Sequence, residues 1–197
     1  MQKKITCDMD NLLSTEERSI LLRLARQALE NGVRRQLLGA LDLSSLPARL
    51  REPGATFVTL TEGGALRGCV GALEAYQPLA EDVREHAIAA ALQDYRFPPV
   101  LPQEVGRIEI EISRLTTPIP LEYEKLEDLL KLLRPGVDGV VLRDGLRRAT
   151  FLPQVWEKLA DPGGFLGHLC MKMGLDANHW RYHKLQVFTY QVEEFHE

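Results

Sequence analysis

The sequence predicts an α+β protein made of two ββαβ-like repeats, each a hairpin followed by a helix and a strand, with mainly antiparallel sheet. Two pairs of strand-like runs surround glycine-containing turns, at Gly63-Gly64 and at Asp144-Gly145. A helix-like run and then a further strand-like run follow each pair. Because hairpins are antiparallel, this order favours α+β over a doubly wound parallel sheet. We therefore expect one two-lobed body.

A helix precedes the first repeat. Ser14 and Glu17 form a capping box, and apolar residues recur behind them at helical spacing. Asn31-Gly32 is predicted to end this helix, because glycine readily adopts the left-handed conformation of a helix stop. The first repeat then takes the hairpin 55–60 and 65–73, the helix 78–92 and a strand in which Ile108, Ile110 and Ile112 alternate with Glu109, Glu111 and Ser113.

The second repeat follows a joining helix over residues 124–133. It comprises the hairpin 137–143 and 146–152, a helix over 162–173 that ends at Gly174, and a final strand over 185–192. The two halves share a pattern rather than residue identity. We expect a single domain over residues 1–197, with lobes of roughly 14–120 and 121–197.

Composition excludes several classes of protein. The cysteines are Cys7, Cys69 and Cys170, an odd and sparse set without a CxxC pair, which argues against a disulfide framework and a structural zinc site. No apolar run approaches the ~20 residues of a membrane span, and the polar N-terminal segment lacks the apolar core of a signal peptide. We expect a soluble cytoplasmic protein. A net charge of −4 with scattered basic residues argues against nucleic-acid binding.

The strand 66–71 (LRGCVG) is the most unusual segment, because glycine weakens strand interiors. Gly68 and Gly71 have two explanations: a neighbouring element packs closely there, or a ligand approaches the backbone. Alternation places Arg67 and Cys69 on one face, about 6–7 Å apart. Arg67 is then a candidate anion anchor that also favours a thiolate, and Cys69 a candidate nucleophile or redox thiol. The alternative makes Cys69 a small buried hydrophobe.

Three further residues are candidates for the same site. Asp94 and Arg96 lie in the loop 94–99 and are expected to pair and to position a ligand, or else to form a structured helix stop. His86 is a candidate base for Cys69, with a satisfied core histidine as its alternative. His179 and His183 are four residues apart but lack further ligands, so no metal site is predicted. GxGxxG, P-loop, HExxH and GxSxG motifs are absent from the sequence.

Several segments together resemble the AMMECR-type domain family, most closely its prokaryotic members, known as protein A of the AmmeMemoRadiSam system. The segments are LRGCVG at 66–71, DYRFPP at 94–99, ISRLTTP at 112–118, GVDGVVLRDG at 136–145, ATFLPQVW at 149–156 and YQVEE at 190–194. The likeness runs from about residue 15 to the C-terminus. Val70 stands where the family usually has isoleucine.

The resemblance implies a two-lobed α+β fold but no established activity. It also implies a pathway shared with a Memo-like protein and a radical S-adenosylmethionine protein, which are the expected partners. No cofactor is evident, and an iron–sulfur cluster would need a set of cysteines that this chain lacks. Three hypotheses follow: a small-molecule-handling protein, with or without catalysis at Cys69; a non-catalytic binding module that uses the same surface; and, more weakly, an RNA-linked role.

Overall fold

The computed structural model describes residues 12–197, so Cys7 lies outside the described part. Contacts divide the chain into two compact units. Unit 1 runs to Leu115 and also includes Glu193–Glu197, whereas unit 2 is Thr116–Val192. Each unit has its own hydrophobic core and its own sheet. The predicted α+β class with antiparallel sheet is confirmed.

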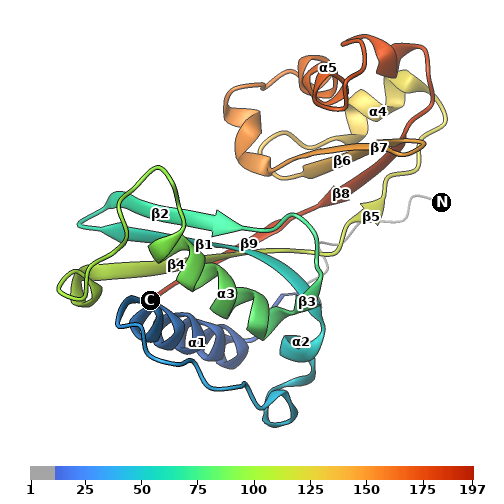
Figure 1. The fold of residues 1–197 in the computed structure, drawn as a ribbon. Helices are drawn as coiled ribbons and strands as arrows, with labels where there is room; N and C mark the ends of the chain where they lie inside the picture. The colour runs from blue at the N-terminus through green and yellow to red at the C-terminus, as the bar shows by residue number, and fades with distance from the viewer. Residues whose placement is uncertain (1–11) are drawn as a thin grey trace. The chain divides into compact units, whose positions relative to one another are not determined.

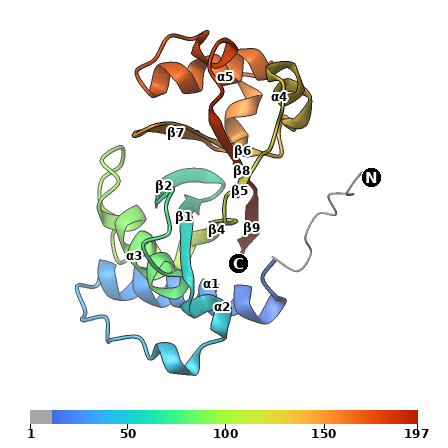
Figure 2. The same ribbon diagram turned by 90° about the vertical axis from the view of Figure 1, so that its right-hand side faces the viewer.

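In unit 1, the helices α1 (Thr15–Val33) and α3 (Leu79–Leu92) cover one face of the sheet, as Figures 1 and 2 show. The capping box of α1 is confirmed, because the amide of Glu17 donates to Ser14 Oγ and the amide of Ser14 donates to Glu17 Oε2. A short helix, α2 (Ala48–Arg51), precedes the first strand.

The predicted end of α1 at Gly32 is wrong. Gly32 remains helical, the helix continues to Val33, and the left-handed residue is Arg35, with φ of 54°. A Cβ at Gly32 would lie 3.2 Å from Ile88 Cγ1 on α3. This glycine therefore allows α1 to pack closely on α3 and does not terminate the helix.

The unit 1 sheet has the order β2-β1-β4-β9, and the short strand β3 also pairs with β1. The predicted hairpin is confirmed, and Gly63 and Gly64 in its turn both have positive φ. Val58 and Leu60 of β1 are buried together with the isoleucines of β4 in the core beneath the helices. The strands are β1 (Pro53–Glu62), β2 (Ala65–Gly71), β3 (Gln77–Pro78), β4 (Ile108–Leu115) and β9 (Val192–His196).

The unit 2 sheet has the order β5-β8-β6-β7. The second predicted hairpin is confirmed, since β6 (Gly139–Asp144) pairs with β7 (Arg147–Phe151) around Gly145, which has positive φ. The helices α4 (Leu126–Leu132) and α5 (Pro162–Lys172) bury apolar side chains in the core of this unit. The other strands of this unit are β5 (Ile119–Pro120) and β8 (Gln186–Tyr190). Within residues 12–197, 3₁₀ helices form at Leu43–Ser45, Val105–Arg107, Pro153–Glu157 and His179–Arg181.

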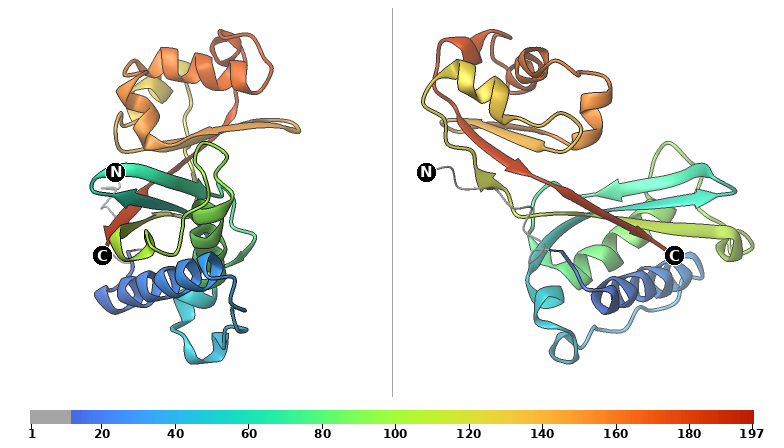
Figure 3. Two further views of the ribbon diagram at one scale, coloured as in Figure 1. Left: turned by 60° about the vertical axis from the view of Figure 1, so that its left-hand side comes forward. Right: turned by 180° about the vertical axis from the view of Figure 1, so that it is seen from behind.

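The sequence predicted one final strand over 185–192, but the structure has two strands there. They are β8, in the sheet of unit 2, and β9, which pairs with β4 in the sheet of unit 1 (Figure 3). The chain changes sheet at Gln191, where Thr116 Oγ1 accepts from the Gln191 amide at 2.8 Å. The alternation of side chains between the two faces continues across Gln191, so the sequence pattern does not reveal that the strand pairs with a different sheet after this residue. Among residues 12–197, no helix is long and apolar enough to cross a membrane.

Candidate functional site

Both glycines of β2 have a packing reason. A Cβ at Gly68 would lie 2.1 Å from the carbonyl oxygen of Ala90 on α3, so Gly68 faces the helices and lets α3 approach the strand. A Cβ at Gly71 would lie 2.3 Å from the carbonyl oxygen of Thr56 and 2.5 Å from Phe57 Cγ, so β1 itself occupies this space. Because strand residues alternate, Cys69 points to the face of the sheet opposite α1 and α3. Its side chain is half-buried there.

The edge of β2 is closed by side chains instead of a neighbouring strand. The amide of Cys69 donates to Asp94 Oδ2 at 2.8 Å, and Arg96 Nη2 donates to the Cys69 carbonyl at 3.2 Å. Arg96 also donates to both oxygens of Asp94, at 2.9 and 2.6 Å. The loop 94–99 therefore satisfies an edge residue that would otherwise offer unpaired backbone groups to another chain. The structure brings these three predicted residues together.

The Asp94–Arg96 pair is ionised over a wide pH range. Hydrogen bonds from the Arg96 side chain hold the pKa of Asp94 well below its usual range, against the opposing effect of burial, and the Cys69 amide adds to the lowering. The pKa of Arg96 is raised chiefly by its hydrogen bond to Asp94. At neutral pH the pair therefore presents a fixed charge arrangement beside the strand.

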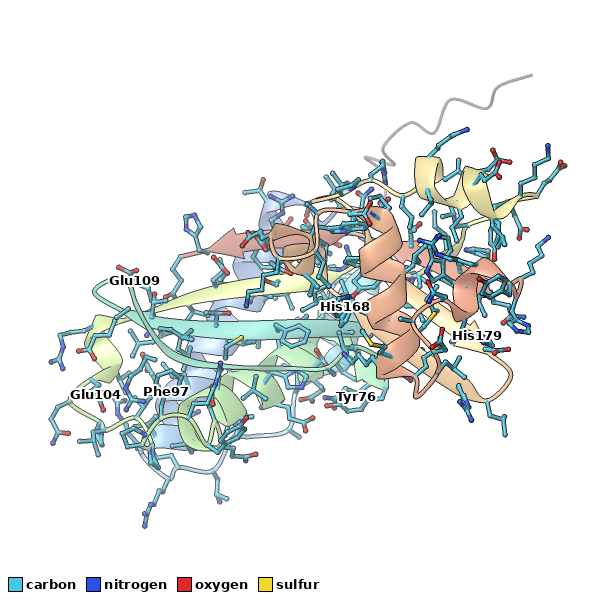
Figure 4. All side chains as sticks on the ribbon, turned by 90° about the horizontal axis from the view of Figure 1, so that it is seen from above. Tyr76, Phe97, Glu104, Glu109, His168 and His179 are labelled. Carbon is cyan, nitrogen blue, oxygen red and sulfur yellow. The ribbon has the colours of Figure 1, made fainter. Side chains whose placement is uncertain are left out.

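Arg67 also joins β2 to the following loop. Its guanidinium donates to both carboxylate oxygens of Glu104, at 2.9 and 3.3 Å, and to the carbonyls of Pro98 and Pro99 (Figure 4 labels Glu104). The hydrogen bonds from Arg67, and next the one from the Leu101 amide, hold the pKa of Glu104 below its ordinary value. With four internal acceptors, the donors of Arg67 are directed at the protein itself. Arg67, the predicted anion anchor, is therefore close to Cys69, but its guanidinium already donates hydrogen bonds to internal acceptors.

His86 is not brought to Cys69. Its Nδ1 lies 3.2 Å from Asp82 Oδ2, and the same carboxylate oxygen accepts from the amide and hydroxyl of Thr56 on β1. His86 and Asp82 both belong to α3 and are buried on the helix-covered face of the sheet. Cys69 points to the other face, so the structure gives His86 the contacts of a core histidine.

The contact of the Cys69 thiol comes from the next strand. Thr59 Oγ1 donates to Cys69 Sγ at 3.3 Å, and the two residues are paired across β1 and β2. Thr59 is paired in turn with Glu111 on β4, so the three residues form one row across three strands. Glu111 is half-buried, and within residues 12–197 its carboxylate makes no hydrogen bond or ion pair. We name Cys69, Thr59 and Glu111 the thiol row.

Sequence reasoning did not assign Thr59 or Glu111 to the site. The alternation of isoleucine and glutamate placed Glu111 on a solvent-exposed face, but only the strand register shows which residue lies across from it.

In unit 2, His179 Nε2 lies 2.8 Å from Asp144 Oδ2, and the His179 ring stacks on His183. The described part of the chain contains no group of three or more His, Cys, Asp or Glu residues arranged to hold a metal ion.

Comparisons with known proteins give one consistent family. A model of the family AMMECR1 matches residues 22–195. A protein of Methanothermobacter thermautotrophicus is 40% identical over 94% of this chain and 96% of its own length, and one of Thermofilum pendens is 37% identical over 94% and 92%. The crystal structure of an uncharacterised protein from Pyrococcus horikoshii matches with a TM-score of 0.73 and 32% identity, covering 94% of this chain and 93% of that one.

Proposed function

The chain belongs to the AMMECR1 family, and we propose that it binds a small polar molecule at the thiol row, on the face of the unit 1 sheet opposite α1 and α3. The observation that carries this proposal is the row itself. A half-buried thiol, a hydroxyl and a half-buried carboxylate that has no partner among residues 12–197 lie side by side on three paired strands. A half-buried carboxylate favours a ligand that donates hydrogen bonds to it.

The surroundings of the row support binding by a rigid surface. Cys69 is held through its backbone by Asp94 and Arg96, and β2 is held through Arg67 by Glu104. A surface that is ordered before the ligand arrives loses little conformational entropy on binding. Two strand spacings, about 10 Å, separate the ends of the row, which is the length of a small metabolite. The network of predicted site residues thus acts as support, and the ligand contacts come from the thiol row.

Cys69 serves as a contacting thiol in this function. Activation of Cys69 by general-base catalysis would require a base within hydrogen-bond reach of Sγ. The hydrogen bond that the described structure gives Sγ comes from the Thr59 hydroxyl, and His86 lies on the other face of the sheet. Binding is therefore better supported than covalent catalysis.

Alkylation with iodoacetamide, followed by mass spectrometry, tests the site. We expect Cys69 to react in the folded protein and Cys170, which is fully buried and whose pKa is raised by burial, to react only after unfolding. The low-molecular-mass fraction of a cell extract should slow alkylation of Cys69. Glu111→Gln should abolish this protection, whereas Glu109→Gln, on the exposed neighbouring position of the strand face, should retain it. A Cys69 that is inert until denaturation, or unprotected by the extract, contradicts the proposal.

A binding module for a Memo-like or a radical S-adenosylmethionine protein is the second candidate function. Tyr95, between Asp94 and Arg96, is 96% exposed, and tyrosine and arginine are common in the centres of protein interfaces. In a pull-down with the purified partners, Tyr95→Ala should weaken capture about 10-fold or more. Tyr182→Ala, at a similarly exposed tyrosine of unit 2, is the matched control. Absence of capture by the unmodified chain excludes this candidate.

A further inference from the structure

A second surface, in unit 2 and unrelated to the thiol row, has a groove that no function above uses. One hollow of about 470 Å³ runs beside β8, and a second of about 520 Å³ lies towards α4. Glu122, Tyr123 and Lys184 line both hollows, so they form one continuous groove. All of its lining residues belong to unit 2.

The floor of the hollow beside β8 is mainly apolar and is held in place. The hydroxyl of Tyr123 donates to the carbonyl of Leu185 at 2.8 Å and accepts from the Leu185 amide at 2.9 Å. Tyr123, Leu185 and Val187 are buried, and Phe188 continues the apolar lining along β8. The strand β5 pairs with the far end of β8, and the Leu121 amide extends this contact by donating to the Val187 carbonyl at 2.8 Å. The floor is thus shaped before any partner arrives.

The rim of the groove is acidic. The carboxylates of Glu122, Glu124 and Asp128 line it, and within residues 12–197 none of them makes an ion pair or hydrogen bond. Lys184 is the basic residue among the lining residues, and its ammonium group lies over the Tyr123 ring, 5.6 Å from the centroid. Like charges along one groove repel each other, and a cationic occupant would offset this repulsion.

We propose that this groove binds a basic, extended segment of a partner protein. Lysine or arginine side chains of the segment would meet the acidic rim, and its apolar side chains would lie on the floor along β8. Charge decides between the occupants: a second copy of this chain, with a net charge of −4, would be repelled by the rim. The joined hollows, one with a mainly apolar floor and one mainly charged, fit a stretch of polypeptide better than a single small cation.

Fluorescence anisotropy with labelled decapeptides tests the proposal on the full chain. A decapeptide of alternating lysine and leucine should bind, and one of alternating glutamate and leucine should not. The double variant Glu122→Gln/Glu124→Gln should weaken binding about 10-fold, and binding by the unmodified chain should weaken as salt is raised from about 50 to 300 mM.

The matched control is Glu157→Gln/Asp176→Asn, which removes the same amount of charge from unit 2 at exposed residues that line neither hollow. It should bind the basic peptide within about twofold of the unmodified chain, as expected for exposed charges outside the contact. Equal binding of both peptides, or equal weakening by the two double variants, overturns the proposal. Spermidine binding as tightly as the peptide also overturns it. Circular dichroism confirms that each variant is folded.

Discussion

Gly68→Ala is expected to destabilise the protein by about 3 kcal/mol or more, at the upper end for an overpacked core site. The added Cβ would lie 2.1 Å from the carbonyl oxygen of Ala90 and 3.0 Å from its carbonyl carbon. Both atoms are backbone of α3, so no side chain can turn away to relieve the contact. Either the helix or the strand must move, and both belong to the core of unit 1. Urea denaturation measures the loss in the free energy of unfolding.

Gly106→Ala is the matched control for this substitution. Gly106 also lies in unit 1, its φ is not in the left-handed region, and a Cβ there would meet nothing within 4 Å. Alanine should therefore change stability by no more than about 1 kcal/mol, and towards greater stability, because it restricts the unfolded chain. If Gly68→Ala were as well tolerated as this control, the close approach of α3 to β2 would be wrong.

Local sequence patterns predicted much of the fold. Glycine-containing turns located both hairpins, because they require positive φ, which Gly63, Gly64 and Gly145 indeed have. Alternation also predicted that Gly68 and Cys69 would face opposite sides of β2, which the close approach of α3 to Gly68 bears out. These features depend on contacts within a few residues, which is why the sequence alone could indicate them.

Features that depend on distant contacts could not be predicted. Gly32 resembles a helix stop until Ile88, on another helix, is known to pack against it. The change of sheet at Gln191 depends on Thr116, far away in the sequence. Glu111 joined the site only through the register of β4 on β1. In each case the sequence shows the residue type, whereas the partner is determined by tertiary structure.

The site shows the same division. The motif residues Arg67, Asp94 and Arg96 were expected to meet a ligand, and the structure places them close to Cys69 as expected. Their hydrogen bonds, however, go to Glu104, to each other and to the backbone of β2. A charged side chain near an unusual strand is compatible with binding or with support, and only the acceptor atoms distinguish the two.

Asp94→Ala is expected to destabilise the protein by about 2 kcal/mol. It leaves the Cys69 amide without its acceptor and the Arg96 guanidinium without its carboxylate, and the exposed position of Arg96 moderates the second effect. It also opens the β2 edge, so we expect slow self-association by size-exclusion chromatography. Tyr95→Phe, in the same loop, should change neither quantity, since the Tyr95 side chain is almost fully exposed. An Asp94→Ala protein as stable as the unmodified one would show that the edge closure contributes little.

The same carboxylate predicts how stability depends on pH. The pKa of Asp94 is lower in the folded protein than in the unfolded chain, where it is about 3.9, so the unfolded state binds this proton more readily. The resulting stabilisation is fully present at neutral pH and is lost as pH falls below about 4. Asp94→Asn lacks this contribution, so its deficit in unfolding free energy should be largest near pH 7 and shrink below pH 4. A constant deficit from pH 7 to pH 3 would mean that the ionised Asp94–Arg96 pair does not stabilise the folded strand edge.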